Sequence, residues 1–213
     1  MNKMQDDNFH YRFRKYVHKR RWLSIWHQLD EVLAMSPEKV LELGPGPGLF
    51  KALAGHFGIN VETVDLDPKL EPDYVASATK LPMESDSYDC VCAFQMLEHL
   101  PYDRSLQAFG EMVRVTKNHI VISLPDAKKI LACWFYLTNL GRKTIHLPMP
   151  RLRQLEHEFD GEHYWEINKK GYPLQKIIND FTSERQVRMR ITYRVDEQPY
   201  HRFFVFEKIK KKL

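Results

Sequence analysis

Short apolar runs, each about as long as one strand, recur along the first 125 residues. The first contains Val40, Leu41 and Leu43 and ends abruptly in a glycine-rich stretch. Continuous runs of this kind are typical of strands in a sheet that is covered on both faces. The pattern predicts strands at 40–43, 61–66, 73–76, 90–94 and 120–125, with helices at about 49–57 and 105–115.

Two helices in this part of the chain carry a clear inward stripe. In the helix over 49–57, Leu49, Leu53 and Phe57 are expected to face the core, and Gly58 should end the helix. An earlier helix lies within residues 22–33. Its apolar positions recur at helical spacing until Ser36-Pro37: Trp22, Ile25, Trp26, Leu29, Val32 and Leu33.

The pattern changes after residue 125. Residues 130–140 form an apolar, helix-like segment that Gly141 closes, and a charged, histidine-rich run continues to Glu166. A short helix at about 172–181 and strands at 186–195 and 201–208 follow. An insertion at this point of an open α/β sheet lies over the carboxyl ends of the strands, where ligands bind. We therefore interpret residues 126–170 as a cap over the substrate.

The basic residues are concentrated at the start of the chain. The formal net charge is only +4, but residues 9–21 hold six Lys or Arg residues interleaved with aromatic ones and no acid. Such a segment could bind RNA or an anionic membrane surface. A solvated helix face with aromatic anchors explains the segment equally well. Both interpretations stay open, and so does the oligomeric state.

Length and composition indicate one globular domain over residues 1–213, because domains commonly have about 100–200 residues. Cys90, Cys92 and Cys133 are odd in number, and two of them alternate within a buried strand, so they are expected to be small buried hydrophobes. No signal peptide is visible at the polar N-terminus. The apolar runs are much shorter than the ~20 residues that span a bilayer, and a cytoplasmic location is expected.

The glycine-rich stretch after the first strand carries the clearest chemistry. Gly44, Gly46 and Gly48 lack a Cβ, so a cofactor can approach the backbone closely. The second strand ends in Asp65, whose carboxylate is placed to accept from the two hydroxyls of a ribose. A nicotinamide-dinucleotide fingerprint would require a third glycine three residues after the second, where Leu49 stands. The dinucleotide interpretation is therefore weaker than a site for S-adenosylmethionine (SAM).

The order of an acid, an apolar residue and Gly-x-Gly-x-Gly, from Glu42 to Gly48, resembles motif I of the class I SAM-dependent methyltransferases. Further matches are Leu81-Pro82 before a short acidic loop with Tyr88-Asp89, then Leu97-Glu98-His99, then Glu111-x-x-Arg114-Val115. These features resemble the small-molecule branch related to the quinone C-methyltransferases, and they cover residues 39–126. The resemblance implies an α/β, Rossmann-like fold with a seven-stranded sheet, helices on both faces and an inserted cap after strand five.

The resemblance also implies positions for the cofactor. Ser77 stands where the family usually presents an Asp to the adenine amino group, so that contact should be weaker here. Strand four ends at Gln95-Met96, where the family places side chains against the methionine arm of the cofactor. The full set of expected cofactor residues is Glu42, Gly44, Pro45, Gly46, Gly48, Asp65, Leu66, Ser77, Ala78, Thr79, Phe94 and Gln95.

Candidate acceptor residues lie in the histidine-rich run at 156–166. His163 and His157 are the candidate catalytic bases, with His163 favoured because Gly161 permits a turn that would aim it inward. Tyr164 and Trp165 are expected to bind the substrate. The His157 to His163 spacing is not that of a zinc helix, so no stable metal is expected. The expected activity is methyl transfer from SAM to a small or medium-sized acceptor. An RNA-directed methyltransferase and a non-catalytic SAM-binding regulator are the alternatives.

Overall fold

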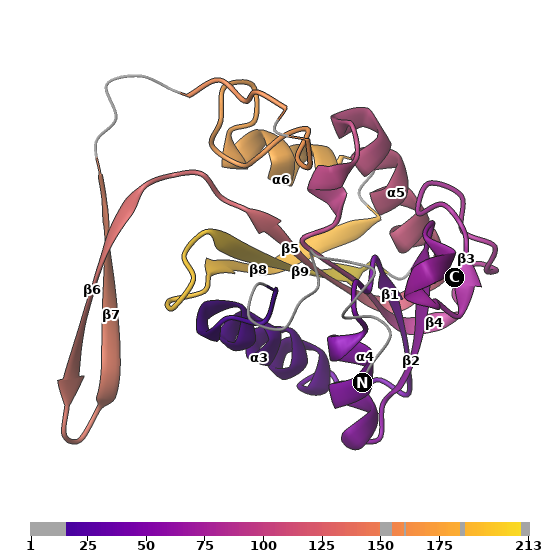
Figure 1. Cartoon of the computed structure of the whole chain (residues 1–213), viewed down its shortest axis with the longest axis horizontal. Helices are drawn as coiled ribbons and strands as arrows, with labels where there is room; N and C mark the ends of the chain where they lie inside the picture. Colours follow the sequence, from indigo (N-terminus) through magenta and orange to yellow (C-terminus); the bar gives the residue numbers. More distant parts are fainter. Residues whose placement is uncertain (1–15, 150–154, 160, 184–185, 210–213) are drawn as a thin grey trace.

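A seven-stranded sheet forms the centre of the protein (Figure 1). The computed structural model describes residues 16–149, 155–159, 161–183 and 186–209, so most of the basic segment at 9–21 lies outside the described residues. The strand order is β3-β2-β1-β4-β5-β9-β8. The strands are β1 (Lys39–Leu43), β2 (Asn60–Asp65), β3 (Tyr74–Val75), β4 (Tyr88–Phe94), β5 (Thr116–Pro125), β8 (Val187–Arg194) and β9 (His201–Lys208).

Strands β1 to β5 are parallel, and β9 runs antiparallel to both β5 and β8. A βαβ crossover is the usual way to join parallel neighbours, so the helices between these strands must cover the two faces of the sheet. The α/β fold with a Rossmann-like seven-stranded sheet, expected from the sequence, is confirmed. The strand predicted at 201–208 is β9, and it pairs antiparallel with β5.

Helices cover both faces of the sheet (Figure 1). Helices α3 (Lys19–Leu33) and α4 (Leu49–His56) pack through Val32, Phe50 and Ala54 on the face that carries Val40 and Cys92. Helices α5 (Tyr102–Val115) and α6 (Leu174–Thr182) pack on the opposite face, where the core includes Leu41, Leu43 and Val91. Side chains of successive strand residues point to opposite faces, which explains this division of one apolar run between two cores.

The inward stripe predicted for α4 was wrong. Phe50 and Ala54 are its buried residues, whereas Phe57 has an exposed fraction of 66%. Gly48 is the N-cap residue, in the left-handed conformation, and the helix itself begins at Leu49. Both 49/53/57 and 50/54 are spaced by four residues, so periodicity alone could not choose between them. The ring of Phe50 meets that of Phe94 edge-on, with centroids 5.1 Å apart, and this contact decides the orientation.

The helix expected at 130–140 is a strand. β6 (Ile130–Leu137) pairs antiparallel with β7 (Gly141–Pro148), and the hairpin projects away from the rest of the protein in Figure 1. Gly141 has a φ of 66°, which permits the tight turn. The run is rich in aromatic and β-branched residues, which favour strands, and a short apolar run cannot be assigned from periodicity.

The described part of the insertion that returns to the sheet comprises residues 155–159 and 161–170, and it is called the segment at 155–170 below. Ile167 bridges to Asp126 beyond the end of β5, its N–H donates to the carbonyl of Pro125 (3.0 Å), and its carbonyl accepts from Ala127 (2.9 Å). The N–H of Tyr164 donates to the carbonyl of Glu98 in the short 3-10 helix η3 (Leu97–His99) at 2.9 Å. These bonds hold the segment at the carboxyl ends of β4 and β5. Among the described residues, no helix combines the length and the apolar character needed to cross a membrane.

Candidate active site

A cavity of roughly 760 Å³ lies at the carboxyl ends of β1, β2 and β4. In open α/β sheets this edge is where ligands bind. The lining comes from the glycine loop, the ends of β2 and β4, the segment at 76–78, helix α3 and its approach, residues 162–163 and the start of β9. Its members are Tyr16, Arg21, Gly44, Gly46, Val64, Asp65, Leu66, Asp67, Leu70, Ala76, Ser77, Ala78, Phe94, Gln95, Met96, His99, Leu100, Glu162, His163, Tyr200 and His201.

The glycine loop forms the floor of this cavity. Gly44, Gly46 and Gly48 have φ values of 67°, 53° and 73°, which side chains rarely adopt. A Cβ on Gly44 would lie 2.4 Å from Cγ of Met96, so only glycine fits at this position without a shift of Met96. Gly44 and Gly46 line the cavity, whereas Gly48 caps α4 and Pro45 is buried below the surface. The loop therefore presents backbone, rather than side chains, to a ligand.

Glu42 lies under the loop at the end of β1 and not on the cavity wall. Its exposed fraction is 4%, and its Oε2 has no hydrogen-bond partner among the described residues. Burial raises the pKa of Glu42 to about 8, against the opposing effect of Lys51. The carboxyl group is therefore mostly protonated at neutral pH. Glu42 is not among the residues that line the cavity, which differs from the direct cofactor contact that the sequence suggested.

Asp65 lines the cavity at the end of β2, as the ribose role requires. Its Oδ1 accepts from the N–H of Asp67 at 2.9 Å, and its carbonyl accepts from Ala76 at 3.0 Å. These bonds fix the carboxylate relative to the neighbouring turn. Leu66 follows on the rim with an exposed fraction of 66%.

Ser77 and Ala78 line the adjoining wall, and Thr79 does not. The Oγ of Ser77 lies 2.9 Å from Oγ1 of Thr79 and accepts from its N–H at 3.3 Å. Thr79, which does not line the cavity itself, thus fixes the position of the Ser77 hydroxyl through these two hydrogen bonds. When the Ser77 hydroxyl donates to Oγ1 of Thr79, one of its two lone pairs is left for a ligand, because the other accepts from the N–H of Thr79.

Phe94, Gln95 and Met96 form the wall that follows β4. Gln95 has a φ of 53°, uncommon for a residue with a side chain, and its N–H donates to the carbonyl of Ser123 at 2.9 Å. Its Nε2 donates to Oγ of Ser123 at 3.3 Å. The bond to β5 offsets the cost of this backbone conformation and fixes the turn beside the cavity.

The opposite wall contains His163, one of the two predicted bases. Its Nδ1 lies 3.3 Å from Oε1 of Glu166. Burial opposes ionisation of Glu166, but the bonds from His163 and Tyr200 and the charge of Lys169 keep the pKa of that carboxyl below its usual value. A carboxylate at this place orients the imidazole and leaves Nε2 as its basic atom.

The other three predicted acceptor residues do not line the cavity. His157 donates from Nε2 to the carbonyl of His163 at 2.7 Å, so it holds the backbone of this segment. Tyr164 is 44% exposed and packs against Phe159. The prediction that Trp165 contacts the substrate was wrong, because its side chain is fully buried and donates from Nε1 to Oγ of Ser105 at 2.9 Å.

Several lining residues were not predicted. Tyr16 and Arg21 reach the cavity from the start of the chain, and the guanidinium of Arg21 stacks over the Tyr16 ring at 4.3 Å. His201 lies at the start of β9, with its Nδ1 2.8 Å from Oγ of Ser24. Burial, with the nearby charges of Arg21 and His18, lowers the pKa of His201 to about 3, so its ring is neutral. The antiparallel direction of β9 was the signal that its start would reach this edge.

The cavity fits a nucleoside cofactor on its own geometry. The floor is bare backbone, a carboxylate stands at the end of the second strand, and a hydroxyl follows in the adjoining loop. A ribose diol can donate to Asp65, and an adenine amino group can donate to Ser77. A sulfonium-bearing amino-acid arm would then extend along Phe94 and Gln95 towards His163.

Comparison with known proteins supports this assignment. The model of the methyltransferase domain family matches residues 9–166, which is more than half of the chain. A search of proteins with curated functions finds no significant match.

Solved structures match over nearly the whole chain. A protein from Pyrococcus horikoshii OT3 (PH0226) is 15% identical, with 98% of this chain and 100% of that chain covered and a TM-score of 0.62. Magnesium protoporphyrin IX methyltransferase from Synechocystis PCC 6803, with bound S-adenosylhomocysteine (SAH), is 12% identical, with coverages of 89% and 84% and a TM-score of 0.61. 1,6-Didemethyltoxoflavin-N1-methyltransferase from Burkholderia thailandensis, with its substrate and SAH bound, is 13% identical, with coverages of 90% and 78% and a TM-score of 0.56. At these identities the likeness concerns the fold, and the family match carries the assignment. The chain therefore belongs to the methyltransferase domain family and is a class I, SAM-dependent methyltransferase.

Proposed function

We propose that this protein methylates a small or medium-sized acceptor that binds beside SAM in the same cavity. One observation carries the proposal. The cavity of roughly 760 Å³ has the cofactor residues on one side and His99, His163 and Leu100 on the other. Its volume lies within the range of about 300–1,000 Å³ that is usual for small-molecule sites. Both reactants therefore have walls of their own within one cavity.

Bound SAM supplies an electrophilic methyl group on a sulfonium, which departs as a neutral thioether. The acceptor's lone pair forms the new bond to carbon while the electron pair of the carbon–sulfur bond stays on sulfur. The protein's main task is then to align the acceptor and exclude water. An oxygen or nitrogen acceptor also releases a proton, and Nε2 of His163 is suited to take it because Glu166 holds Nδ1.

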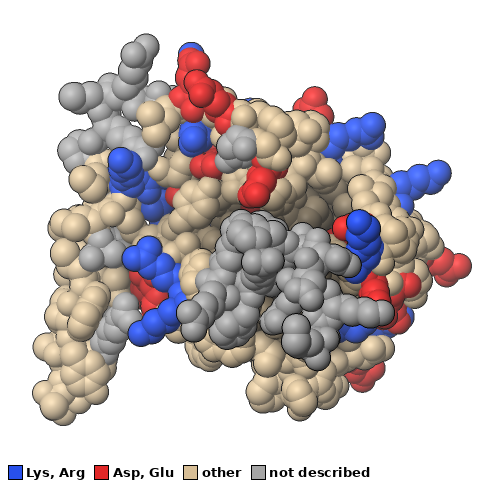
Figure 2. Space-filling model, viewed as in Figure 1, with Lys and Arg blue, Asp and Glu red and all other residues tan. Residues whose placement is uncertain are grey.

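An RNA acceptor is the second candidate, because Tyr16 and Arg21 at the end of the basic segment line the cavity. On the face in Figure 2, however, the described Lys and Arg side chains are scattered among Asp and Glu side chains. An RNA-binding surface more often has a continuous basic stripe. This favours the small acceptor.

The test incubates the purified protein and labelled SAM with a cell extract that has been separated into small molecules, RNA and protein. Label should appear in the small-molecule fraction, as a product one methylene heavier than its precursor. Label in RNA, with binding that weakens steeply as salt is raised, would support the second candidate instead. SAH binding without transfer to any fraction would indicate a non-catalytic regulator.

His163→Ala tests the acceptor side of the site. Turnover should fall by about 10²- to 10⁴-fold, the usual contribution of a general base. SAH affinity should stay within about twofold, because the cofactor residues are on the other wall. The matched control is His56→Ala, an exposed histidine at the end of α4. Unchanged turnover in His163→Ala would remove this residue from the reaction.

A further inference from the structure

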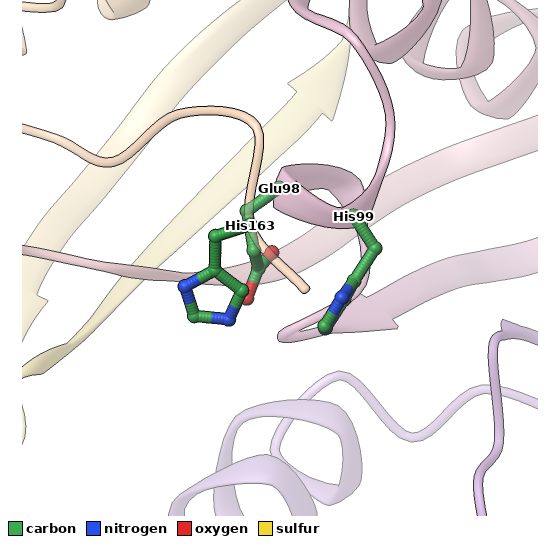
Figure 3. A group of neighbouring side chains, drawn as sticks. All are labelled: Glu98, His99 and His163. Atoms are coloured by element: carbon green, nitrogen blue, oxygen red, sulfur yellow. The ribbon is translucent and has the colours of Figure 1, made fainter. Parts of the chain in front are cut away.

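Three side chains that are distant in sequence converge beside the cavity: Glu98 and His99 on η3, and His163 on the segment at 155–170 (Figure 3). One possible ligand atom from each lies within 4.8 Å of the other two. The backbone holds them together independently, because the carbonyl of Glu98 accepts from the N–H of Tyr164 at 2.9 Å. The imidazoles of His99 and His163 meet edge-on, with centroids 5.0 Å apart.

Glu98 is the unusual member of this cluster. Its exposed fraction is 0%, and neither carboxylate oxygen has a hydrogen-bond partner among the described residues. A buried carboxylate without a partner is costly, and buried charges are normally paired or coordinate metals. Within the described part of the chain, no Lys or Arg side chain donates a hydrogen bond to either oxygen. A cation is the ligand that would satisfy both oxygens.

Both histidines are already held in the tautomer that suits a metal. Nδ1 of His99 donates to the carbonyl of Glu162 (2.9 Å), and Nδ1 of His163 faces Oε1 of Glu166 (3.3 Å). In each neutral ring the lone pair is then on Nε2. Metal-ligating histidines characteristically donate their other N–H to a carboxylate or backbone carbonyl in this way.

We propose that Glu98, His99 and His163 bind one divalent transition-metal ion at the acceptor side of the cavity. Two imidazoles and one carboxylate suit Zn²⁺, Fe²⁺ or Mn²⁺ better than Mg²⁺ or Ca²⁺, which prefer sites made only of oxygen. Three protein ligands leave open positions for water or substrate. Ligand atoms around tetrahedral zinc lie about 3.4 Å apart, so the atoms of this cluster, now within 4.8 Å of one another, must approach by up to about 1.4 Å. His99 is exposed, so its side chain has room to move towards the other two ligands.

The consequence for the acceptor rests on the function proposed above. His99 and His163 line the cavity, so an open position on the ion faces the space left for the acceptor. An acceptor oxygen bound there would lose its proton more easily, as metal-bound water does. While the ion is bound, Nε2 of His163 would be a ligand, so the proton would leave to solvent; without the ion, the same atom keeps the role of base proposed above. The site would favour acceptors with a hydroxyl or phenol group.

The test is a metal titration that needs no acceptor. Full-length protein is treated with a chelator, dialysed, and titrated with Zn²⁺ by calorimetry and with Co²⁺ by visible absorption. Wild-type protein should bind one equivalent. His99→Ala, an exposed position, and Glu98→Gln, of similar volume, should each weaken binding by at least tenfold, because even residues behind the ligands contribute about 10- to 100-fold. His56→Ala, the matched control, should bind as wild type does.

Two results would overturn the proposal. One is the absence of saturable binding to folded wild-type protein, which would mean that Glu98 is simply a buried, protonated acid. The other is equal affinity in wild type, His99→Ala and Glu98→Gln. If metal does not bind but His163→Ala still lowers turnover, the methyltransferase function stands and His163 is a base. If metal binds but no fraction is methylated, the site stands and the function fails.

Discussion

Replacing Glu42 by Gln should change how the stability of the protein depends on pH. Glu42 is 4% exposed, and burial raises its pKa from 4.5 to about 8. In the unfolded chain the carboxyl loses its proton near pH 4.5, whereas in the folded protein it keeps it until about pH 8. The unfolded state therefore binds fewer protons between these values, and the free energy of unfolding falls as pH rises through this window.

The magnitude follows from the two pKa values. At about 1.36 kcal/mol per pH unit, the full loss is about 5 kcal/mol, and about 2–3 kcal/mol of it falls between pH 6 and pH 9. Glu42→Gln keeps the shape of the protonated acid but cannot ionise. Relative to wild type, the variant should therefore gain about 2–3 kcal/mol of unfolding free energy from pH 6 to pH 9.

Urea unfolding at pH 6, 7, 8 and 9 measures this difference. Any fixed cost of the carboxamide cancels when the difference between variant and wild type is compared across pH. Glu38→Gln, an exposed position just before β1, controls for the change in net charge. A difference between Glu42→Gln and wild type that does not change with pH would refute the reasoning, because Glu42 would then be ionised in the folded protein.

Other positions carry predictions of comparable sharpness. Gly44→Ala should abolish measurable SAH binding by calorimetry and lower the melting temperature, because its Cβ would lie 2.4 Å from Met96 and its φ is 67°. Ser77→Asp should tighten SAH binding through a charge-assisted bond to the adenine amino group; weaker binding in a folded variant would show that the loop does not meet adenine. Asp126→Asn should reduce the free energy of unfolding, measured in urea, by about 3–5 kcal/mol. The substitution removes the carboxylate that pairs with two largely buried side chains, Arg194 and Arg202. Nε of Arg194 and Nε of Arg202 donate to Oδ2 of Asp126 at 2.9 and 2.7 Å. A decrease in unfolding free energy below about 1 kcal/mol would show that water replaces the carboxylate.

The sheet was predictable because its strands are continuous apolar runs, which are typical of strands in a sheet that is covered on both faces. Val40 on one face and Leu41 and Leu43 on the other are all apolar, and the structure buries all three. The hairpin at 130–148 was not predictable, because its apolar run has no period that separates strand from helix. In α4, two stripes of equal spacing competed, and the choice depended on the ring of Phe94, which is distant in sequence.

The cofactor side of the site was more accessible to prediction than the acceptor side. The glycine loop and Asp65 lie within about one βαβ unit, so local spacing fixes their relation. His163, Tyr164 and Trp165 are adjacent in sequence, yet one lines the cavity, one is exposed and one is buried. The approach of His163 to Glu98 depends on how the segment at 155–170 folds back onto η3. This long-range packing cannot be predicted from the local sequence pattern.

Binding of SAH to the wild-type protein and to Asp65→Ala, measured by calorimetry, tests the central claim most directly. Wild type should bind one equivalent, and Asp65→Ala should lose about 1.5–3 kcal/mol, or about 10- to 150-fold in affinity, as for a hydrogen bond to a charged group. Asp30→Ala, an exposed carboxylate on α3, should bind as wild type does. Absence of SAH binding to wild type, or equal affinity in Asp65→Ala, would contradict the placement of the cofactor in this cavity.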